Sequence, residues 1–139
     1  MKKILITLMA LMTLSCANQE IAESVPKKQP VKEFLARVTY YWPGDGGQVG
    51  TITATGRRAY CGRSAAVDPK VIPYGTEIYI PKMGKTLVAV DTGSAVKSRK
   101  ASKAVGRNNI VIDVFCANRS EARRRIAKYP MFMKIQVKK

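Results

Sequence analysis

The chain has 139 residues, which suits one domain of ordinary size and leaves little room for a second. Its 25 lysines and arginines outnumber nine acidic residues, giving a formal net charge of +16, and it contains no histidine. Catalysis by a histidine base is therefore excluded, and acid–base chemistry near neutral pH would fall to a carboxylate or to a lysine, tyrosine or cysteine of shifted pKa.

The N-terminus resembles an export signal. Two lysines precede an apolar run over residues 4–14, which is too short to span a bilayer. Cys16 then stands where a lipoprotein signal would place its lipidated cysteine. We therefore predict a signal peptide over residues 1–15 and an exported protein. It would be anchored in the cell envelope through a lipid on Cys16 and would face the periplasm.

The positive charge and the remaining cysteines fit such a location. A strongly basic exported protein predicts an anionic partner such as a wall polymer or membrane lipid, whereas export argues against nucleic acid. A well-solvated basic surface is the alternative. An oxidising compartment favours a disulfide between Cys61 and Cys116, with two separate buried thiols as the other interpretation.

A polar segment with two prolines, residues 16–33, predicts a flexible tether before a folded domain over residues 34–139. Within that domain, runs rich in β-branched and aromatic residues alternate with glycine and proline turns. This predicts six or seven short strands, over residues 34–42, 51–55, 76–80, 86–90, 110–115 and 131–137, with residues 64–67 leading into the turn at Asp68. One helix is predicted, capped by Asn118 or Ser120 and ended by Pro130. This pattern predicts a small, mainly β barrel.

Three aspartates lie in distinct settings. Asp91 ends an apolar run and Asp113 lies within one, so partial desolvation is expected to raise the pKa of each carboxyl. Asp68 precedes a proline and a turn, where its carboxylate can accept from nearby backbone N–H groups, and a structural role is expected. The scattered acids and the missing histidine give metal binding little support.

Four motifs in order carry a family resemblance: TATG at residues 53–56, AVDPKVIPYGTEIYI at 66–80, VAVDTGSAVKS at 88–98 and IDVF at 112–115. Together they closely resemble the three-aspartate, or 3D, domain, which is similar to the catalytic core of membrane-bound lytic transglycosylase A. The resemblance implies a six-stranded double-psi β-barrel, to which the sequence itself adds the one short C-terminal helix. It also implies cleavage of peptidoglycan between N-acetylmuramic acid and N-acetylglucosamine, without a cofactor.

The motif around Asp91 departs from the family pattern. Ser94 and Ser98 stand where the family has glycines, and a basic insert over residues 99–109 delays Asp113. If the insert loops out, Asp91 and Asp113 can still meet. If it shifts the last strand, the site is damaged.

The resemblance assigns a role to each matching residue. Asp113 would be the single acid/base group and Asp91 a nearby second carboxylate, although a salt-bridged Asp113 is the alternative. The sequence also predicts a set of substrate-binding residues, for which core packing, a tight turn or a solvated surface are the competing interpretations: Tyr41, Trp42, Thr55, Gly56, Gly93 and Lys97.

Three interpretations of function follow. The first is a monomeric lytic transglycosylase acting on peptidoglycan glycan strands. The second is a wall-binding module on the same barrel, similar to expansin-like or rare lipoprotein A domains, which grips glycan without cutting it. A basic structural lipoprotein that bridges membrane and wall by charge is a third possibility, and high salt should release such a protein.

Overall fold

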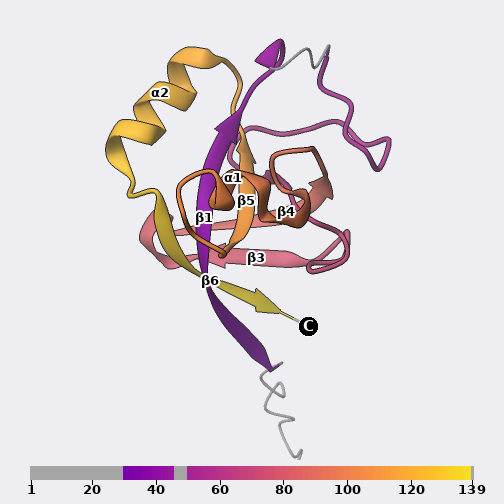
Figure 1. The fold of residues 1–139 in the computed structure, drawn as a ribbon. Helices are drawn as coiled ribbons and strands as arrows, with labels where there is room; N and C mark the ends of the chain where they lie inside the picture. The colour runs from indigo at the N-terminus through magenta and orange to yellow at the C-terminus, as the bar shows by residue number, and fades with distance from the viewer. Residues whose placement is uncertain (1–29, 46–49, 139) are drawn as a thin grey trace, which may run out of the picture.

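The computed structural model describes residues 30–45 and 50–138, and within them six strands wrap into a closed barrel (Figure 1). The strands are β1 (Val31–Tyr41), β2 (Ser64–Ala66), β3 (Glu77–Ile80), β4 (Lys85–Asp91), β5 (Ile110–Phe115) and β6 (Phe132–Lys138). Their order around the barrel is β1-β5-β2-β4-β3-β6. The β1/β5 and β2/β4 pairs are parallel and the other neighbours run antiparallel. The predicted mainly β, six-stranded barrel is confirmed.

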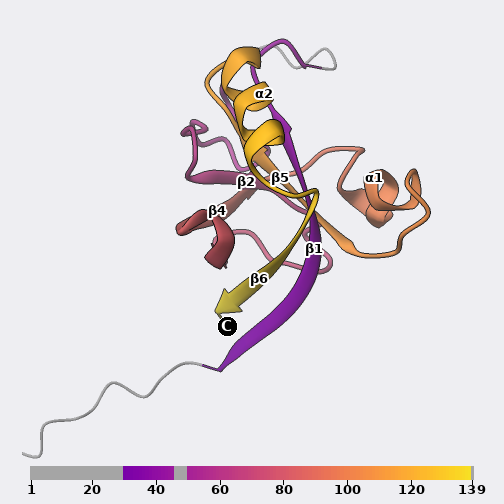
Figure 2. The same cartoon turned by 90° about the vertical axis from the view of Figure 1, so that its left-hand side faces the viewer.

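Two helices lie on different parts of the barrel surface. The longer helix, α2, begins after Asn118, whose side-chain oxygen accepts from the Glu121 N–H at 2.9 Å. It packs against β1, whereas the short α1 projects from another side of the barrel (Figure 2). The predicted helix is therefore confirmed. The helical elements are η2 (Pro81–Met83), η3 (Lys97–Arg99), α1 (Lys100–Lys103) and α2 (Arg119–Lys128).

The structure differs from the prediction in one strand and in the start of β1. Residues 51–55 form a turn instead of a strand, with a single bridge between Ile52 and Arg58. The reason is local, because the Thr53 hydroxyl donates to the Arg57 carbonyl at 2.8 Å and holds the segment folded on itself. The strand β1 starts at Val31, inside the segment predicted as a tether.

The barrel interior is filled by aliphatic side chains from alternating strand positions. Fully buried members of this core include Ile78, Leu87, Ile112 and Ile135. A second buried cluster lies on the outer face of the barrel and consists of Tyr41, Ala59, Ala66, Val96, Val111 and Phe115. This outer cluster supports the candidate site, because the flanking strand residues present their polar side chains on the same face.

The predicted signal peptide, the lipidation of Cys16 and most of the tether lie outside the described residues. Among the helices of residues 30–45 and 50–138, none is long and apolar enough to span a membrane.

Candidate active site

Asp91 and Asp113 lie on one rung that runs across four neighbouring strands. Thr39 of β1 pairs with Asp113 of β5, Asp113 pairs with Ala66 of β2, and Ala66 pairs with Asp91 of β4. Residues paired across strands present their side chains on the same face of a sheet. The two carboxylates therefore share a face and are separated by two inter-strand spacings, about 10 Å between backbones.

A bulge in β4 aims Asp91 toward this face. Leu87 and Ala89 point into the barrel, so strict alternation would send Asp91 inward as well. In the pairing with β2, however, Ala65 lies opposite Ala89 and the next residue, Ala66, lies opposite Asp91. Val90 is therefore an extra residue in β4 that has no partner in β2. One extra residue reverses the direction of the next side chain, a common device beside functional sites. Asp91 consequently meets the outer cluster instead of the apolar interior.

The Asp91 carboxylate is held by three donors. Its Oδ2 accepts from the Tyr41 hydroxyl at 2.8 Å, and its Oδ1 accepts from the backbone N–H groups of Ala54 and Thr92, both at 2.9 Å. The residue is only 4% exposed. Burial, together with the bond to Asp91, raises the pKa of Tyr41 and keeps its hydroxyl a donor. This arrangement fixes Asp91 in place and suits a positioning role.

Asp113 has a different environment. Its Oδ1 accepts from the Thr39 hydroxyl at 2.8 Å, and within the described chain no hydrogen bond reaches its second oxygen. Burial raises the pKa of this carboxyl to about 6, with smaller contributions from the charges of Asp45 and Asp91, whereas the Thr39 bond opposes the rise. A partly accessible carboxyl with such a pKa can both give and accept a proton near neutral pH.

Asp45 is a neighbour that the sequence did not single out. Its backbone N–H donates to the Trp42 carbonyl at 3.0 Å, in the turn that follows β1. Its negative charge acts on Asp113 more strongly than that of Asp91 does. Asp45 lies in a glycine-rich loop that has no periodic apolar pattern, so no signal in the sequence indicates its position next to Asp113. In the described residues, these carboxylates do not gather into a group that could hold a metal ion.

Asp68 lies in a separate structural position. Its Oδ1 accepts from the Lys70 N–H at 3.1 Å and its Oδ2 from the Ser98 N–H at 3.0 Å. The bond from Ser98 is the largest cause that lowers the pKa of Asp68, and the charge of Lys97 adds to it. The carboxylate thus ties the turn after β2 to the turn before α1, which supports the expected structural role.

Ser98 occupies a left-handed conformation, with φ of +52° and ψ of +23°. This conformation costs an L-residue about 1–2 kcal/mol, and a glycine avoids that strain at a loss of backbone entropy of about 0.5–1 kcal/mol. We expect Ser98→Gly to raise the free energy of unfolding by about 0.5–1 kcal/mol, measured by urea denaturation. Ser94→Gly is the matched control, because Ser94 does not have a positive φ and should gain nothing. Equal effects of the two changes would contradict the assignment of strain to Ser98.

The turn over residues 53–56 covers Asp91. The Thr55 hydroxyl donates to the Val90 carbonyl at 3.0 Å, and Gly56 has a φ of +74°, which favours glycine. Together with the bond from Ala54, these contacts attach the turn to the end of β4. Thr55 and Gly56 therefore lie at the rim of the site, where the prediction of substrate contact remains open to test.

The aromatic residues at the end of β1 divide between two environments. Tyr41 is 6% exposed, and its ring meets Phe115 edge-on with centroids 5.3 Å apart. Its ring is therefore part of the outer cluster and is not presented as a surface for stacking on a sugar. Trp42 is half-buried and follows directly, so it is the aromatic residue that remains available at this end of the strand.

The two other predicted substrate residues lie after β4. Gly93 is half-buried, and a Cβ added there would meet nothing within 4 Å, so the position is open. Lys97 is exposed at the start of η3, and its charge acts on Asp68. The structure thus associates Lys97 with Asp68 rather than with the Asp91–Asp113 rung.

The basic insert, residues 99–109, folds as a side lobe. The buried Ser102 hydroxyl accepts from the Asn109 N–H at 3.1 Å, and the Arg37 guanidinium donates to the Ala101 carbonyl. The lobe returns the chain to β5 in register, since Asp113 pairs with both Thr39 and Ala66. The insert therefore loops out and leaves the rung intact.

The predicted disulfide is not formed in the structure, where Cys61 and Cys116 are both free. The Cys61 thiol donates to Glu121 Oε2 at 2.9 Å, and Cys116 is fully buried. Burial raises the pKa of Cys116 to about 12, so it is a protonated thiol in this state. The alternative of two separate thiols describes the structure.

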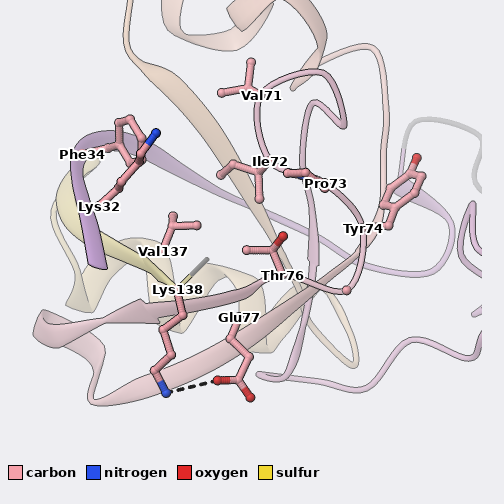
Figure 3. A pocket seen from close by; sticks show the side chains of 11 residues that line it. Lys32, Phe34, Val71, Ile72, Pro73, Tyr74, Thr76, Glu77, Val137 and Lys138 are labelled. Carbon is pink, nitrogen blue, oxygen red and sulfur yellow. Dashed lines mark hydrogen bonds and ion pairs between the residues drawn. The ribbon is translucent and has the colours of Figure 1, made fainter. Parts of the chain in front are cut away.

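Two hollows differ in their relation to the carboxylates. One of about 720 Å³ lies where β1 begins and β6 ends, with Phe34, Ile72 and Val137 converging on it and a Lys138–Glu77 ion pair at its edge (Figure 3). This hollow is remote from the rung, because Asp113 pairs with Thr39, which lies near the opposite end of β1. A second groove of about 410 Å³ includes Thr39, the partner of Asp113, and is the hollow adjoining the site.

A family model for the 3D domain matches residues 63–136, a span that contains all three motif aspartates. The chain belongs to the 3D domain family. This confirms the resemblance drawn from the sequence motifs. This 3D domain protein is also 31% identical over 113 residues to the cell wall-binding protein YocH of Bacillus subtilis, an alignment that covers 79% of this chain and 35% of YocH.

Solved structures similar to the 3D domain protein include two lytic transglycosylases. LtgG of Burkholderia pseudomallei is 24% identical with a TM-score of 0.43, over 63% of this chain and 25% of LtgG. MltA of E. coli is 20% identical with a TM-score of 0.44, over 66% of this chain and 28% of MltA. The chain thus spans about a third of YocH and about a quarter of either transglycosylase.

Proposed function

We propose that this protein is a lytic transglycosylase that cleaves peptidoglycan between N-acetylmuramic acid and N-acetylglucosamine. The observation that carries the proposal is the state of Asp113, a mostly buried carboxyl with a pKa of about 6 at a rung shared with Asp91. Membership of the 3D family supports it, since the motifs that define the resemblance contain these residues.

The proposed reaction needs one proton-transferring group. Protonated Asp113 donates its proton to the glycosidic oxygen, and the bond from that oxygen to C1 of the muramic acid breaks. The C6 hydroxyl of the same sugar then attacks C1, while the Asp113 carboxylate accepts the hydroxyl proton. The products are a 1,6-anhydro sugar and a free glycan end, and Asp113 returns to its protonated form. Hydrolytic glycosidases generally use a pair of carboxyls, the second of which activates water or attacks C1 itself.

A groove next to the hydrogen-bond partner of Asp113 suits a carbohydrate substrate. It is lined by Thr39, Tyr129, Ile126 and Met131, the last two of which are 59% and 49% exposed, although Asp113 itself does not line it. Sugar rings present apolar faces that aromatic and aliphatic side chains can cover, and sites of this kind combine such walls with a few polar groups. In this proposal, Asp91 acts as a positioning residue that fixes the 53–56 turn above the rung.

Product analysis tests the proposal directly. The protein from Ala17 onward, which retains all of β1, should release 1,6-anhydromuropeptides from purified peptidoglycan, as detected by mass spectrometry. Release of reducing-end products alone would indicate hydrolysis and contradict the lytic scheme. Glycan binding without any release would support a binding module.

The pH dependence should follow the Asp113 carboxyl. Because the acid must be protonated, we expect turnover to fall about tenfold per pH unit above the apparent pKa, which lies near 6. Thr39→Val removes the bond that lowers this pKa and should move the alkaline limb to higher pH. Asp45→Asn removes a charge that raises it and should move the limb the opposite way. Shifts in the same direction for both variants would contradict the assignment of this limb to Asp113.

The second candidate function is glycan binding without cleavage. It is favoured by the similarity to YocH, a cell wall-binding protein, over a segment that covers 79% of this chain. The shared segment is only 35% of YocH, so wall binding there can reside elsewhere in that protein. The product analysis above separates the two candidates.

Either function implies an envelope location. We propose export by the N-terminal signal and lipid attachment at Cys16, both of which precede the described residues. Acyl labelling that is lost in Cys16→Ala would support this anchor. An unlabelled wild-type protein would exclude it.

A further inference from the structure

A cationic hollow lies between helix α2 and the start of β4, and Tyr129 lines both this hollow and the groove that includes Thr39. The cationic hollow has a volume of about 330 Å³ and is lined by Lys85, Glu121, Arg124, Arg125, Lys128 and Tyr129. Arg124 and Lys128 lie four residues apart and therefore on the same face of α2. Lys85 approaches from the barrel, so cations from two separate elements converge on one space.

The acidic residue of this hollow is already engaged. Glu121 Oε1 accepts from the Arg125 guanidinium at 2.7 Å, and its Oε2 accepts from the Cys61 thiol and the Ala117 N–H. The bonds from Cys61 and Arg125 lower the pKa of Glu121 to about 2, so it stays ionised in this pairing. Among the described residues, no carboxylate forms an ion pair with Lys85, Arg124 or Lys128.

We propose that this hollow, the α2–β4 cationic site, binds a phosphate group carried on a polymer of the cell wall. Three cations without an ionic partner repel one another, and a bound anion removes that repulsion. A single carboxylate or phosphodiester carries one charge, so neither neutralises three cations alone. A polymer with phosphodiesters in every repeat brings several permanent charges and acceptor oxygens to donors arriving from different sides. The arrangement thus matches a polyanionic phosphate polymer better than an isolated anion.

The position of the apolar residues on α2 favours a polymer over a membrane surface. A helix that docks on lipid presents large apolar side chains alongside its basic residues. The exposed apolar residue of α2 is Ile126, which lies about 200° around the helix from both Arg124 and Lys128. The cationic face therefore has no adjoining apolar anchor on its own helix.

The site goes beyond the proposed catalysis and does not depend on it. Calorimetry measures the binding of inorganic polyphosphate of defined length. When Lys85, Arg124 and Lys128 are all replaced by Gln, the affinity should fall about tenfold or more. The remaining affinity should also depend less on salt concentration. The matched control replaces Lys70, Lys100 and Lys103 by Gln, which removes the same charge from exposed positions near the side lobe. We expect the control to change binding less than about twofold. Lys85→Gln alone lies outside α2, so it tests the site even if the triple variant disturbs the helix.

Cosedimentation with purified walls identifies the natural ligand class. Wild-type protein should bind walls that retain their phosphodiester polymers and should bind more weakly after those polymers are removed with acid. The Lys70, Lys100 and Lys103 control variant should behave like wild type in both cases. If the two triple variants lost binding affinity equally, binding would depend on net charge alone, and the proposal of a site would be overturned. Equivalent binding to vesicles of anionic lipid, or unchanged binding to phosphate-free walls, would overturn the assignment to a wall phosphate.

Discussion

Asp113→Asn is expected to lower the release of 1,6-anhydromuropeptides by at least about a thousandfold, because general acid–base transfer alone contributes about 10²–10⁴ and this residue would perform both steps. The amide has nearly the shape of the carboxyl and can still accept from the Thr39 hydroxyl. It cannot donate a proton to the leaving oxygen. Mass spectrometry of the soluble products measures the loss.

Stability distinguishes a catalytic role from a structural one. The pKa of Asp113 is raised in the folded state, so its ionised form opposes folding, and stability decreases as the pH rises through about 6. An uncharged Asn has no charge to bury, so it avoids the free-energy cost of an ionised side chain at this position. Asp113→Asn should therefore unfold at the same or a higher urea concentration at pH 8. Asp45→Asn, which removes a neighbouring carboxylate without removing the acid, should retain activity near the pH optimum.

Two results would contradict this assignment. Unchanged turnover in Asp113→Asn would exclude it as the acid. Loss of turnover together with a large loss of stability would show that the carboxyl maintains the fold, because the raised pKa predicts the reverse.

The fold was predictable because its signals are local. Apolar alternation, glycine and proline turns and the Asn118 cap define five of the strands and α2 to within a few residues. The exception is the segment over residues 51–55, whose threonines match a strand by composition but bond to nearby backbone. Propensity cannot separate these outcomes, since a strand is decided by partners far along the chain.

The site was predictable only in part. The motif residues Asp68, Asp91 and Asp113 were identified by resemblance, and their different environments follow from features that the sequence does not display. The skipped residue Val90, which turns Asp91 outward, depends on the register between β2 and β4. The bond from Tyr41 to Asp91 joins residues 50 positions apart. Such long-range contacts leave no periodic pattern in the chain.

The insert shows how a departure from the family pattern can be absorbed. Residues 99–109 add charge and length, yet the pairing of β5 is kept because the lobe is tied to itself at Ser102 and to β1 through Arg37. At the start of the insert, Ser98 adopts a left-handed backbone conformation, in which its N–H donates to the Asp68 carboxylate. The structural aspartate thus stabilises the turn from which the insert departs.

Asp91→Ala is expected to lower the free energy of unfolding by about 3 kcal/mol, because it removes the buried acceptor of three hydrogen bonds. Three donors would lose their acceptor: the Tyr41 hydroxyl and the N–H groups of Ala54 and Thr92. A buried donor left without a partner costs about 1–3 kcal/mol, and the separate losses do not simply add. Urea denaturation gives the change, provided that the slope of the transition stays constant.

Asp91→Asn and Tyr41→Phe resolve how that loss arises. The Asn carbonyl can still accept from Ala54 and Thr92, while its NH₂ can donate to the Tyr41 oxygen, so we expect a cost of only about 1–2 kcal/mol. Tyr41→Phe should cost a similar amount, and the double variant should cost less than the sum because both changes remove one bond. Additive costs would show that Tyr41 and Asp91 act independently. A stable Asp91→Ala protein with normal turnover would remove Asp91 from the site altogether. If the variant is destabilised but still folded in the assay and its turnover nevertheless falls, the second carboxylate serves the reaction by holding the 53–56 turn in place next to β4.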